Sequence, residues 1–145
     1  MNNRNNFTWI SNTSTVIWQE LSDLYTMAPL GKKEPHDLEI VFNNSMFKYF
    51  VYDNEKLIGV GRALADGVDC SYICDVAIHP EYQGRGIGKA IIEKLVKDSK
   101  GHTKIILYAV SNKEPFYAKF GFAKMKTAMA IFKNQSWARE IGLVE

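Results

Sequence analysis

Three glycines at alternate positions stand where a strand-like segment ends and an amphipathic helix begins, in the run Gln83-Gly84-Arg85-Gly86-Ile87-Gly88-Lys89. Glycine inside a first helical turn costs roughly 1 kcal/mol relative to alanine, so the run needs a compensating role. Without Cβ atoms, the main-chain N–H groups at the positive end of the helix dipole are open to an anion. Arg85 and Lys89 add positive charge beside them. The run therefore predicts a strand, turn and helix that hold an anion, and a diphosphate matches best.

Two familiar phosphate loops fail on spacing. The dinucleotide fingerprint needs G-x-G-x-x-G and an acidic residue about 20 positions later, but here the third glycine comes one place early and Tyr108 lies at the acidic position. In the P-loop the second glycine follows the first by five positions and Ser or Thr follows the lysine, whereas Gly88 follows Gly84 by four and Ala90 follows Lys89. A tight turn that binds no ligand remains open as an alternative.

The periodicity elsewhere predicts an α/β (α+β) fold: a mixed, mostly antiparallel central sheet with a splayed parallel strand pair and helices on both faces. A strand, helix, strand order requires a right-handed crossover, so the strands before and after the third helix are expected to be parallel. We expect Ser14 or Thr15 to be the N-cap of the first helix and Asp37 the N-cap of the second. Gly101 is the expected C-cap of the third helix. The expected strands are 7–11, 48–52, 57–64, 71–78, 104–110 and 122–132, and the expected helices are 15–25, one from Asp37 through Phe42, 87–98 and 114–119.

Length and composition bound the class of protein. At 145 residues with 46% hydrophobic and 23% charged residues, the chain is expected to be one domain spanning 1–145. A net charge of +2 does not favour a nucleic-acid partner, although residues 1–83 carry −5 and residues 84–145 carry +7. We find neither a secretion signal at the N-terminus nor an apolar run that would span a membrane. Cys70 and Cys74 are spaced unlike a zinc or redox pair, so we expect a cytoplasmic protein with reduced thiols and no metal site.

The pattern Q-x-x-G-x-G, given by Gln83, Gly86 and Gly88, resembles that of the GNAT superfamily of acetyl-CoA-dependent N-acetyltransferases. Residues 75–89 are similar to the strongest motif of this family, and Glu-Pro-Phe-Tyr-Ala-Lys-Phe-Gly-Phe at 114–122 is similar to its second motif. The second motif looks like that of arylalkylamine N-acetyltransferases. The order and spacing of elements match across most of residues 7–132.

The resemblance implies acetyl-CoA as co-substrate and no metal. It implies that the main chain of the strand pairs with the pantetheine arm like an added strand, that a bulge opens the gap in which the acyl group lies, and that a main-chain N–H near Val76 polarises the thioester carbonyl. An asparagine in the following loop often binds the cofactor in this family. The implied cofactor-binding residues are Val76, Ala77, Ile78, Gln83, Gly84, Arg85, Gly86, Ile87, Gly88, Lys89 and Asn112.

Tyr117 matches the family tyrosine that protonates the departing thiolate, and a phenol near pKa 10 is a suitable donor. The base is less defined, because relatives often carry a glutamate or histidines on the strand where this chain has Tyr72 and Cys74. Asp75 is expected to be structural and His79 is a weaker candidate base. A chain of water molecules leading the amine proton to solvent is the preferred account.

The resemblance also implies an acceptor site near the first two helices. Its candidate residues are apolar or aromatic, although core packing explains the same pattern: Trp18, Tyr25, Met27, Phe42, Phe47 and Tyr72. The expected activity is acetyl transfer to a small-molecule or peptide primary amine by direct attack in a ternary complex. A module that binds acetyl-CoA without turnover is the alternative. We expect residues 135–144 to form either a contact in a homodimer or a terminal helix that closes the core of the monomer.

Overall fold

The computed structural model describes residues 6–145, and the chain divides into two compact units, one up to Ile106 and one spanning Leu107–Glu145. The polar stretch at 1–5, interpreted above as unlike a secretion signal, lies outside the described residues. In residues 6–145, no helix is long and apolar enough to cross a membrane.

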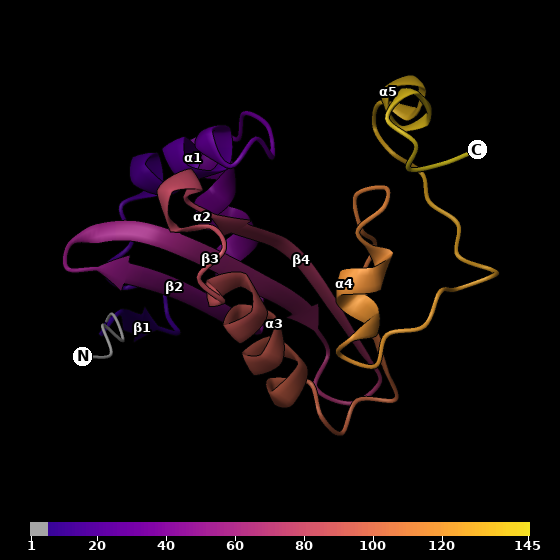
Figure 1. Ribbon diagram of the computed structural model, residues 1–145, viewed down its shortest axis with the longest axis horizontal. Coiled ribbons are helices and arrows are strands. Elements are labelled where there is room, and N and C mark those ends of the chain that lie inside the picture. The colour runs from indigo at the N-terminus through magenta and orange to yellow at the C-terminus, as the bar shows by residue number, and fades with distance from the viewer. Residues whose placement is uncertain (1–5) are drawn as a thin grey trace. The chain divides into compact units, whose positions relative to one another are not determined.

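The first unit is built on a five-stranded sheet in the order β1-β2-β3-β4-β5 (Figure 1). Neighbours are antiparallel except β4 and β5, which are parallel. This confirms the mixed sheet and the crossover through the third helix. The strands are β1 (Thr8–Ile10), β2 (Phe47–Asp53), β3 (Lys56–Ala65), β4 (Cys70–Ile78) and β5 (Lys104–Ile106).

The expected strand at 104–110 is wrong in length, because β5 pairs with β4 only from Lys104 to Ile106. Its partners on β4 are Cys70, Ser71 and Tyr72. The ladder thus ends three residues before Asp75, where β4 leaves regular strand geometry with φ of 55°. A chain segment without a ladder partner is not held in the extended conformation of a strand.

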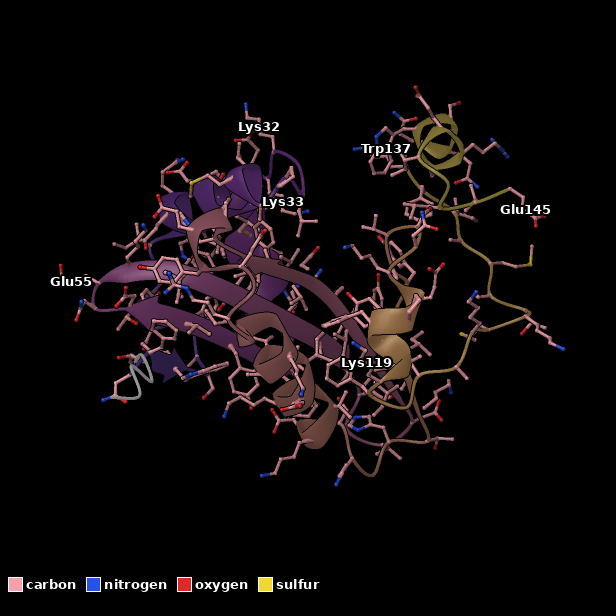
Figure 2. All side chains as sticks on the ribbon, in the orientation of Figure 1. Lys32, Lys33, Glu55, Lys119, Trp137 and Glu145 are labelled. Carbon is pink, nitrogen blue, oxygen red and sulfur yellow. The ribbon has the colours of Figure 1, made fainter. Side chains whose placement is uncertain are left out.

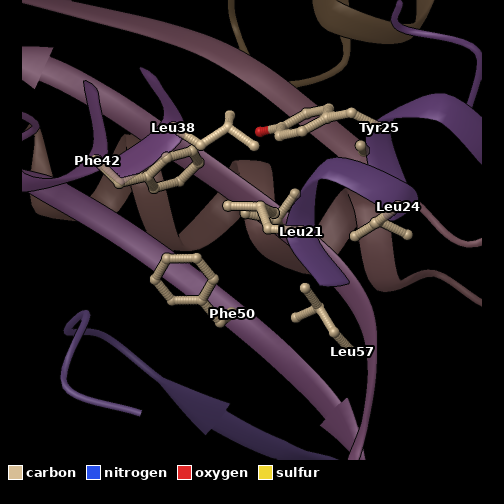
Figure 3. Packing of buried hydrophobic residues seen from close by; sticks show 9 residues of the cluster. Leu21, Leu24, Tyr25, Leu38, Phe42, Phe50 and Leu57 are labelled. Atoms are coloured by element: carbon tan, nitrogen blue, oxygen red, sulfur yellow. The ribbon is translucent and has the colours of Figure 1, made fainter. Parts of the chain in front are cut away.

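Helices α1 (Trp18–Met27) and α2 (Pro35–Asn43) cover one face of this sheet and supply most of its core. Leu21, Leu24 and Tyr25 repeat at helical spacing on α1 and have no exposed surface. Figure 3 shows them in one cluster with Phe42 of α2 and Phe50 of β2, and Leu21 points toward these two rings. Burial of these side chains, at about 1.5–3 kcal/mol each, stabilises the α1/α2 layer.

Helix α3 (Ile87–Asp98) packs on the other face. Side chains alternate along a strand, and on β3 Val60 belongs to the α1/α2 core whereas Gly59 and Gly61 approach α3. A Cβ on Gly61 would lie 2.5 Å from Cγ2 of Ile91. Glycine at this position therefore allows α3 to lie close to the strand, and helices on both faces are confirmed.

Two helix starts differ from expectation. Ser14 is engaged with Asn12, whose Oδ1 accepts from its N–H at 3.0 Å, and α1 starts later with Ile17 as N-cap. Pro35 opens α2 because its fixed φ suits a first helical position. Asp37 therefore lies inside the first turn rather than at the cap. The C-cap of α3 is Ser99, two residues before the expected Gly101.

The second unit contains α4 (Glu114–Ala118) and α5 (Gln135–Glu140). The helix expected at 114–119 is confirmed within one residue, but the strand expected at 122–132 is wrong: that stretch is irregular in the described structure. Met129 and Ile131 are 97% and 98% exposed there. Alternating apolar residues form a strand only where a neighbouring strand completes the ladder.

Candidate active site

The glycine run forms a tight turn between β4 and α3. A short 3-10 turn, Pro80–Tyr82, leads into it, and Gly84 and Gly86 follow with φ of 77° and 80°. Such values suit glycine, because side chains of L-residues strain this conformation. Gly86 is the N-cap of α3, and a Cβ on either glycine would meet no described atom within 4 Å. The main chain of the turn is therefore exposed and accessible to a ligand.

Arg85 and Lys89 bring positive charge to this turn. The first turn of α3 reads Ile87-Gly88-Lys89-Ala90 and carries no carboxylate. Arg85 lies with its guanidinium carbon 4.9 Å from the ring centroid of Tyr82, and the Tyr82 hydroxyl donates to Asp53 at 2.5 Å. Tyr82 thus ties the turn to the β2–β3 hairpin and holds Arg85 beside the helix N-terminus. The arrangement suits an anion with several oxygens.

Gln83 and the end of β4 were expected to contact the cofactor. The Gln83 side chain donates through Nε2 to the carbonyl of Ile78 at 3.3 Å, so it fastens the turn to the strand. Val76 and Ile78 are half-buried and Ala77 is buried. Within residues 6–145, the pairing of β4 with β5 stops at Tyr72, so Ile73–Ile78 pair with β3 alone. The opposite edge of this stretch has main-chain groups that an extended ligand could pair with.

A bulge interrupts β4 at Asp75. Arg62 of β3 is in register with Cys74 and Val60 with Ala77, so Asp75 and Val76 together oppose Gly61. Asp75 is one of three described non-glycine residues with positive φ, at 55°. The bulge predicted from the family resemblance is therefore present, and it includes Val76, the first of the β4 residues expected to bind the cofactor.

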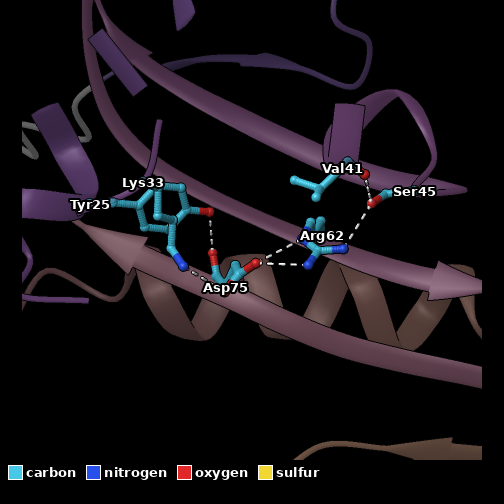
Figure 4. Close-up of polar contacts among 6 residues, drawn as sticks. All are labelled: Tyr25, Lys33, Val41, Ser45, Arg62 and Asp75. Carbon is cyan, nitrogen blue, oxygen red and sulfur yellow. Dashed lines mark hydrogen bonds and ion pairs between the residues drawn. The ribbon is translucent and has the colours of Figure 1, made fainter. Parts of the chain in front are cut away.

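Polar side chains from α1 and β3 hold this bulge (Figure 4). The Tyr25 hydroxyl donates to the main-chain carbonyl of Asp75 at 2.7 Å, and Arg62 donates to its carboxylate at 2.8 and 2.9 Å. Lys33 Nζ lies 3.8 Å from the same carboxylate. Arg62 also donates to Ser45 at 3.2 Å. The structural role expected for Asp75 agrees with these contacts.

Sequence reasoning missed Tyr25 and Arg62 as parts of this arrangement. Tyr25 was expected either to contact the acceptor or to pack in the core, and it has no exposed surface, but its contact with the bulge was not expected. Arg62 was not singled out at all. The sequence could have indicated Arg62, because it is the single charged residue in the apolar run Leu57–Ala65. A charge in a buried strand needs a partner.

The candidate bases near the bulge are poorly suited to take a proton. Burial raises the pKa of the Cys74 thiol to about 11. His79 is buried, and its Nδ1 accepts from the Glu81 N–H at 3.1 Å. The Asp75 carboxylate is held in its ion pairs. Across residues 6–145, no group of three or more His, Cys, Asp or Glu side chains could hold a metal ion.

Tyr117 and Asn112 belong to the second unit and are described within it. Tyr117 lies on α4 with its ring 5.1 Å from that of Phe116 and 6.3 Å from that of Phe122. Burial raises the pKa of its hydroxyl, so the hydroxyl stays protonated at neutral pH. Asn112 is exposed with φ of 72°. Their roles toward acetyl-CoA stay predictions.

The expected acceptor residues divide by burial. Tyr25 and Phe42 have no exposed surface and belong to the core, so neither can contact an acceptor. Met27 is 45% exposed. It lines a surface pocket of about 440 Å³ at the hairpin end of the first unit, where Figure 2 shows Glu55 at the tip. Glu20, which also lines this pocket, accepts through Oε1 from the Leu57 N–H at 2.6 Å, so this carboxylate is already engaged.

Comparison with known proteins connects this geometry to a family. The model of the acetyltransferase (GNAT) family matches residues 15–122. The uncharacterized N-acetyltransferase ycf52 of Pyropia yezoensis is 30% identical over 122 residues, which cover 80% of this chain and 70% of that protein. The chloroplastic serotonin N-acetyltransferase 2 of Oryza sativa is 41% identical over 83 residues, covering 54% of this chain and 42% of that one.

Among solved structures, a probable acetyltransferase from meticillin-resistant Staphylococcus aureus superposes with a TM-score of 0.77 at 27% identity. The superposition covers 87% of this chain and 98% of the chain of that structure. The family match spans β4, the glycine turn and α3. The chain therefore belongs to the GNAT family and is an acetyltransferase.

Proposed function

We propose that this protein transfers the acetyl group of acetyl-CoA to a primary amine by direct attack within a ternary complex. One observation carries the proposal: the stretch of β4 that pairs with β3 alone runs directly into an exposed glycine turn at the N-terminus of α3. A strand edge followed by an anion site matches a ligand with an extended amide-containing arm and a diphosphate.

The residues fit acetyl-CoA in the order in which its parts occur. The main chain of Val76, Ala77 and Ile78 would pair with the pantetheine arm. The N–H groups from Gly84 to Lys89 would hold the diphosphate, with the side chain of Arg85 beside them. Lys89 Nζ lies 3.9 Å from Glu93 Oε1 in an exposed ion pair, and because such pairs are weak the ammonium could turn toward a phosphate. Gln83 would act indirectly by fastening the turn to Ile78.

The chemistry then needs position more than strong acid or base groups. The amine nitrogen attacks the thioester carbonyl carbon, a C–N bond forms and the C–S bond breaks. The Val76 N–H would stabilise the charge on the carbonyl oxygen. The Tyr117 hydroxyl, which its raised pKa leaves protonated at neutral pH, would protonate the leaving thiolate, and the tyrosinate would regain a proton from water. The amine proton would leave through water, since Cys74, His79 and Asp75 are unsuited to accept it.

For the acceptor, we propose a small-molecule or peptide primary amine. The resemblance of residues 114–122 to arylalkylamine N-acetyltransferases and the relative named for serotonin favour testing an arylalkylamine first. The two cysteines are free thiols, which supports a reducing compartment such as the cytoplasm. Some relatives are named chloroplastic.

The test measures release of the CoA thiol from acetyl-CoA with tryptamine, putrescine and a lysine-containing peptide, for the wild type and Tyr117→Phe. We expect turnover with at least one amine and a loss of kcat of at least about tenfold in the variant, with unchanged acetyl-CoA binding. Acetyl-CoA binding without thiol release for any amine would instead favour a module without turnover. Equal kcat for both proteins would remove Tyr117 from the mechanism.

A further inference from the structure

We propose that Tyr25 is a positioning residue for acetyl transfer. Its hydroxyl holds the peptide group between Asp75 and Val76 in the orientation that aims the Val76 N–H at the thioester carbonyl. This inference rests on the proposed function, because it concerns the N–H that polarises the substrate there.

The geometry of the peptide group gives the first step. In a trans peptide the C=O and N–H bonds are coplanar and point in opposite directions. The carbonyl of Asp75 and the N–H of Val76 belong to the same peptide group, and no described peptide bond is cis. The Tyr25 hydroxyl binds that carbonyl at 2.7 Å. Fixing the carbonyl toward α1 therefore fixes the Val76 N–H in the direction away from α1.

The bulge needs such an anchor, because the ladder does not supply one. Asp75 and Val76 together oppose the single residue Gly61, so regular pairing with β3 is interrupted there. The φ of 55° at Asp75 costs about 1–2 kcal/mol for a residue with a Cβ. Arg62 holds the Asp75 side chain and Tyr25 holds its main chain (Figure 4). Only the second contact controls the direction of the peptide group.

Tyr25 is suited to this task by its surroundings. Its ring has no exposed surface and belongs to the α1/α2 core, so the hydroxyl has little freedom to move (Figure 3). Burial, and then the nearby charge of Asp75, raise the pKa of the hydroxyl well above 10, so it remains a donor at every working pH. A hydrogen bond to a peptide carbonyl also polarises the group and strengthens its N–H as a donor.

The test compares Tyr25→Phe with Tyr52→Phe, which removes the same atom from a partly buried tyrosine packed against the same core cluster. With acetyl-CoA and the three amines above, we expect Tyr25→Phe to lower kcat by about tenfold, less than the hundredfold or more for deleting an oxyanion donor. Its acetyl-CoA dissociation constant, measured by calorimetry, is expected to change by less than about threefold, since binding to the turn is not altered. Tyr52→Phe is expected to keep the wild-type kcat.

A second readout follows the peptide group itself. We expect the amide ¹⁵N resonance of Val76 to move in Tyr25→Phe and to stay in place in Tyr52→Phe, since a hydrogen bond on the preceding carbonyl changes the electron density of that amide. An unmoved Val76 resonance, or a kcat equal to the wild type, overturns the inference. So does a loss of kcat matched by an equal loss of acetyl-CoA affinity. A wild-type protein that does not bind acetyl-CoA overturns the proposed function itself.

Discussion

Replacing Gly61 by alanine is expected to destabilise the first unit, because α3 leaves no room for a methyl group. The added Cβ would lie 2.5 Å from Cγ2 of Ile91, 3.2 Å from Cδ1 of Leu95 and 3.3 Å from Cγ2 of Val76. Ile91 and Leu95 have no exposed surface, so neither can swing into solvent. Overpacking of this kind costs about 1–3 kcal/mol, and the stiffer unfolded chain returns about 0.4–1 kcal/mol. The net expectation is a loss of about 1–2 kcal/mol.

Urea denaturation of the full chain, followed by circular dichroism, measures this loss as a lower midpoint at unchanged slope. Gly88→Ala is the matched control, because its Cβ would come no nearer than 3.6 Å, to Cγ1 of Ile78. Alanine in the first turn of a helix is expected to leave stability unchanged or to raise it by up to about 1 kcal/mol. A Gly61→Ala protein as stable as the wild type would refute the close approach of α3 to β3.

Three more substitutions test the glycine turn, the ion pair of Asp75 and the buried thiol of Cys74. Gly86→Ala strains the φ of 80° at the N-cap of α3 and is expected to weaken acetyl-CoA binding at least tenfold in calorimetry. Arg62→Met leaves the Asp75 carboxylate without its main partner. The free energy of unfolding, measured by urea denaturation, is expected to fall by about 1–3 kcal/mol, which lies between the effects of breaking surface and buried ion pairs. Burial raises the pKa of the Cys74 thiol from 9.0, its value as a free thiol, to about 11 in the folded chain. The folded state therefore holds this proton more tightly, and stability is expected to fall as pH rises from 9 to 11, with a smaller fall in Cys74→Ala by thermal denaturation.

Much of the first unit could be predicted because its signals are local. The strands expected at 48–52, 57–64 and 71–78 are present as β2, β3 and β4, and neighbouring strands among them are antiparallel. The spacing of apolar residues in 87–98 predicted a helix, and α3 spans the same residues. Hydrophobic periodicity and turn chemistry act within a few residues of each other, so the sequence alone carries them.

The expectations were wrong where contacts between residues far apart in the sequence determine the structure. Residues 122–132 alternate like a strand, but a strand also needs a ladder partner, and Ile131 is exposed. The role of Tyr25 depends on a carbonyl 50 residues away, which no local pattern reveals. The glycine turn was recognised from spacing, whereas the network that holds the bulge beside it required the folded chain.

The direct test of the central assignment is calorimetry of the wild-type chain with acetyl-CoA and, separately, with acetyl-pantetheine, which lacks the diphosphate. A glycine turn that holds the diphosphate predicts saturable heat for acetyl-CoA and an affinity for acetyl-pantetheine at least about tenfold lower. Equal affinities, or no saturable heat with acetyl-CoA at millimolar concentration, would contradict the assignment of the turn at Gly84 and Gly86.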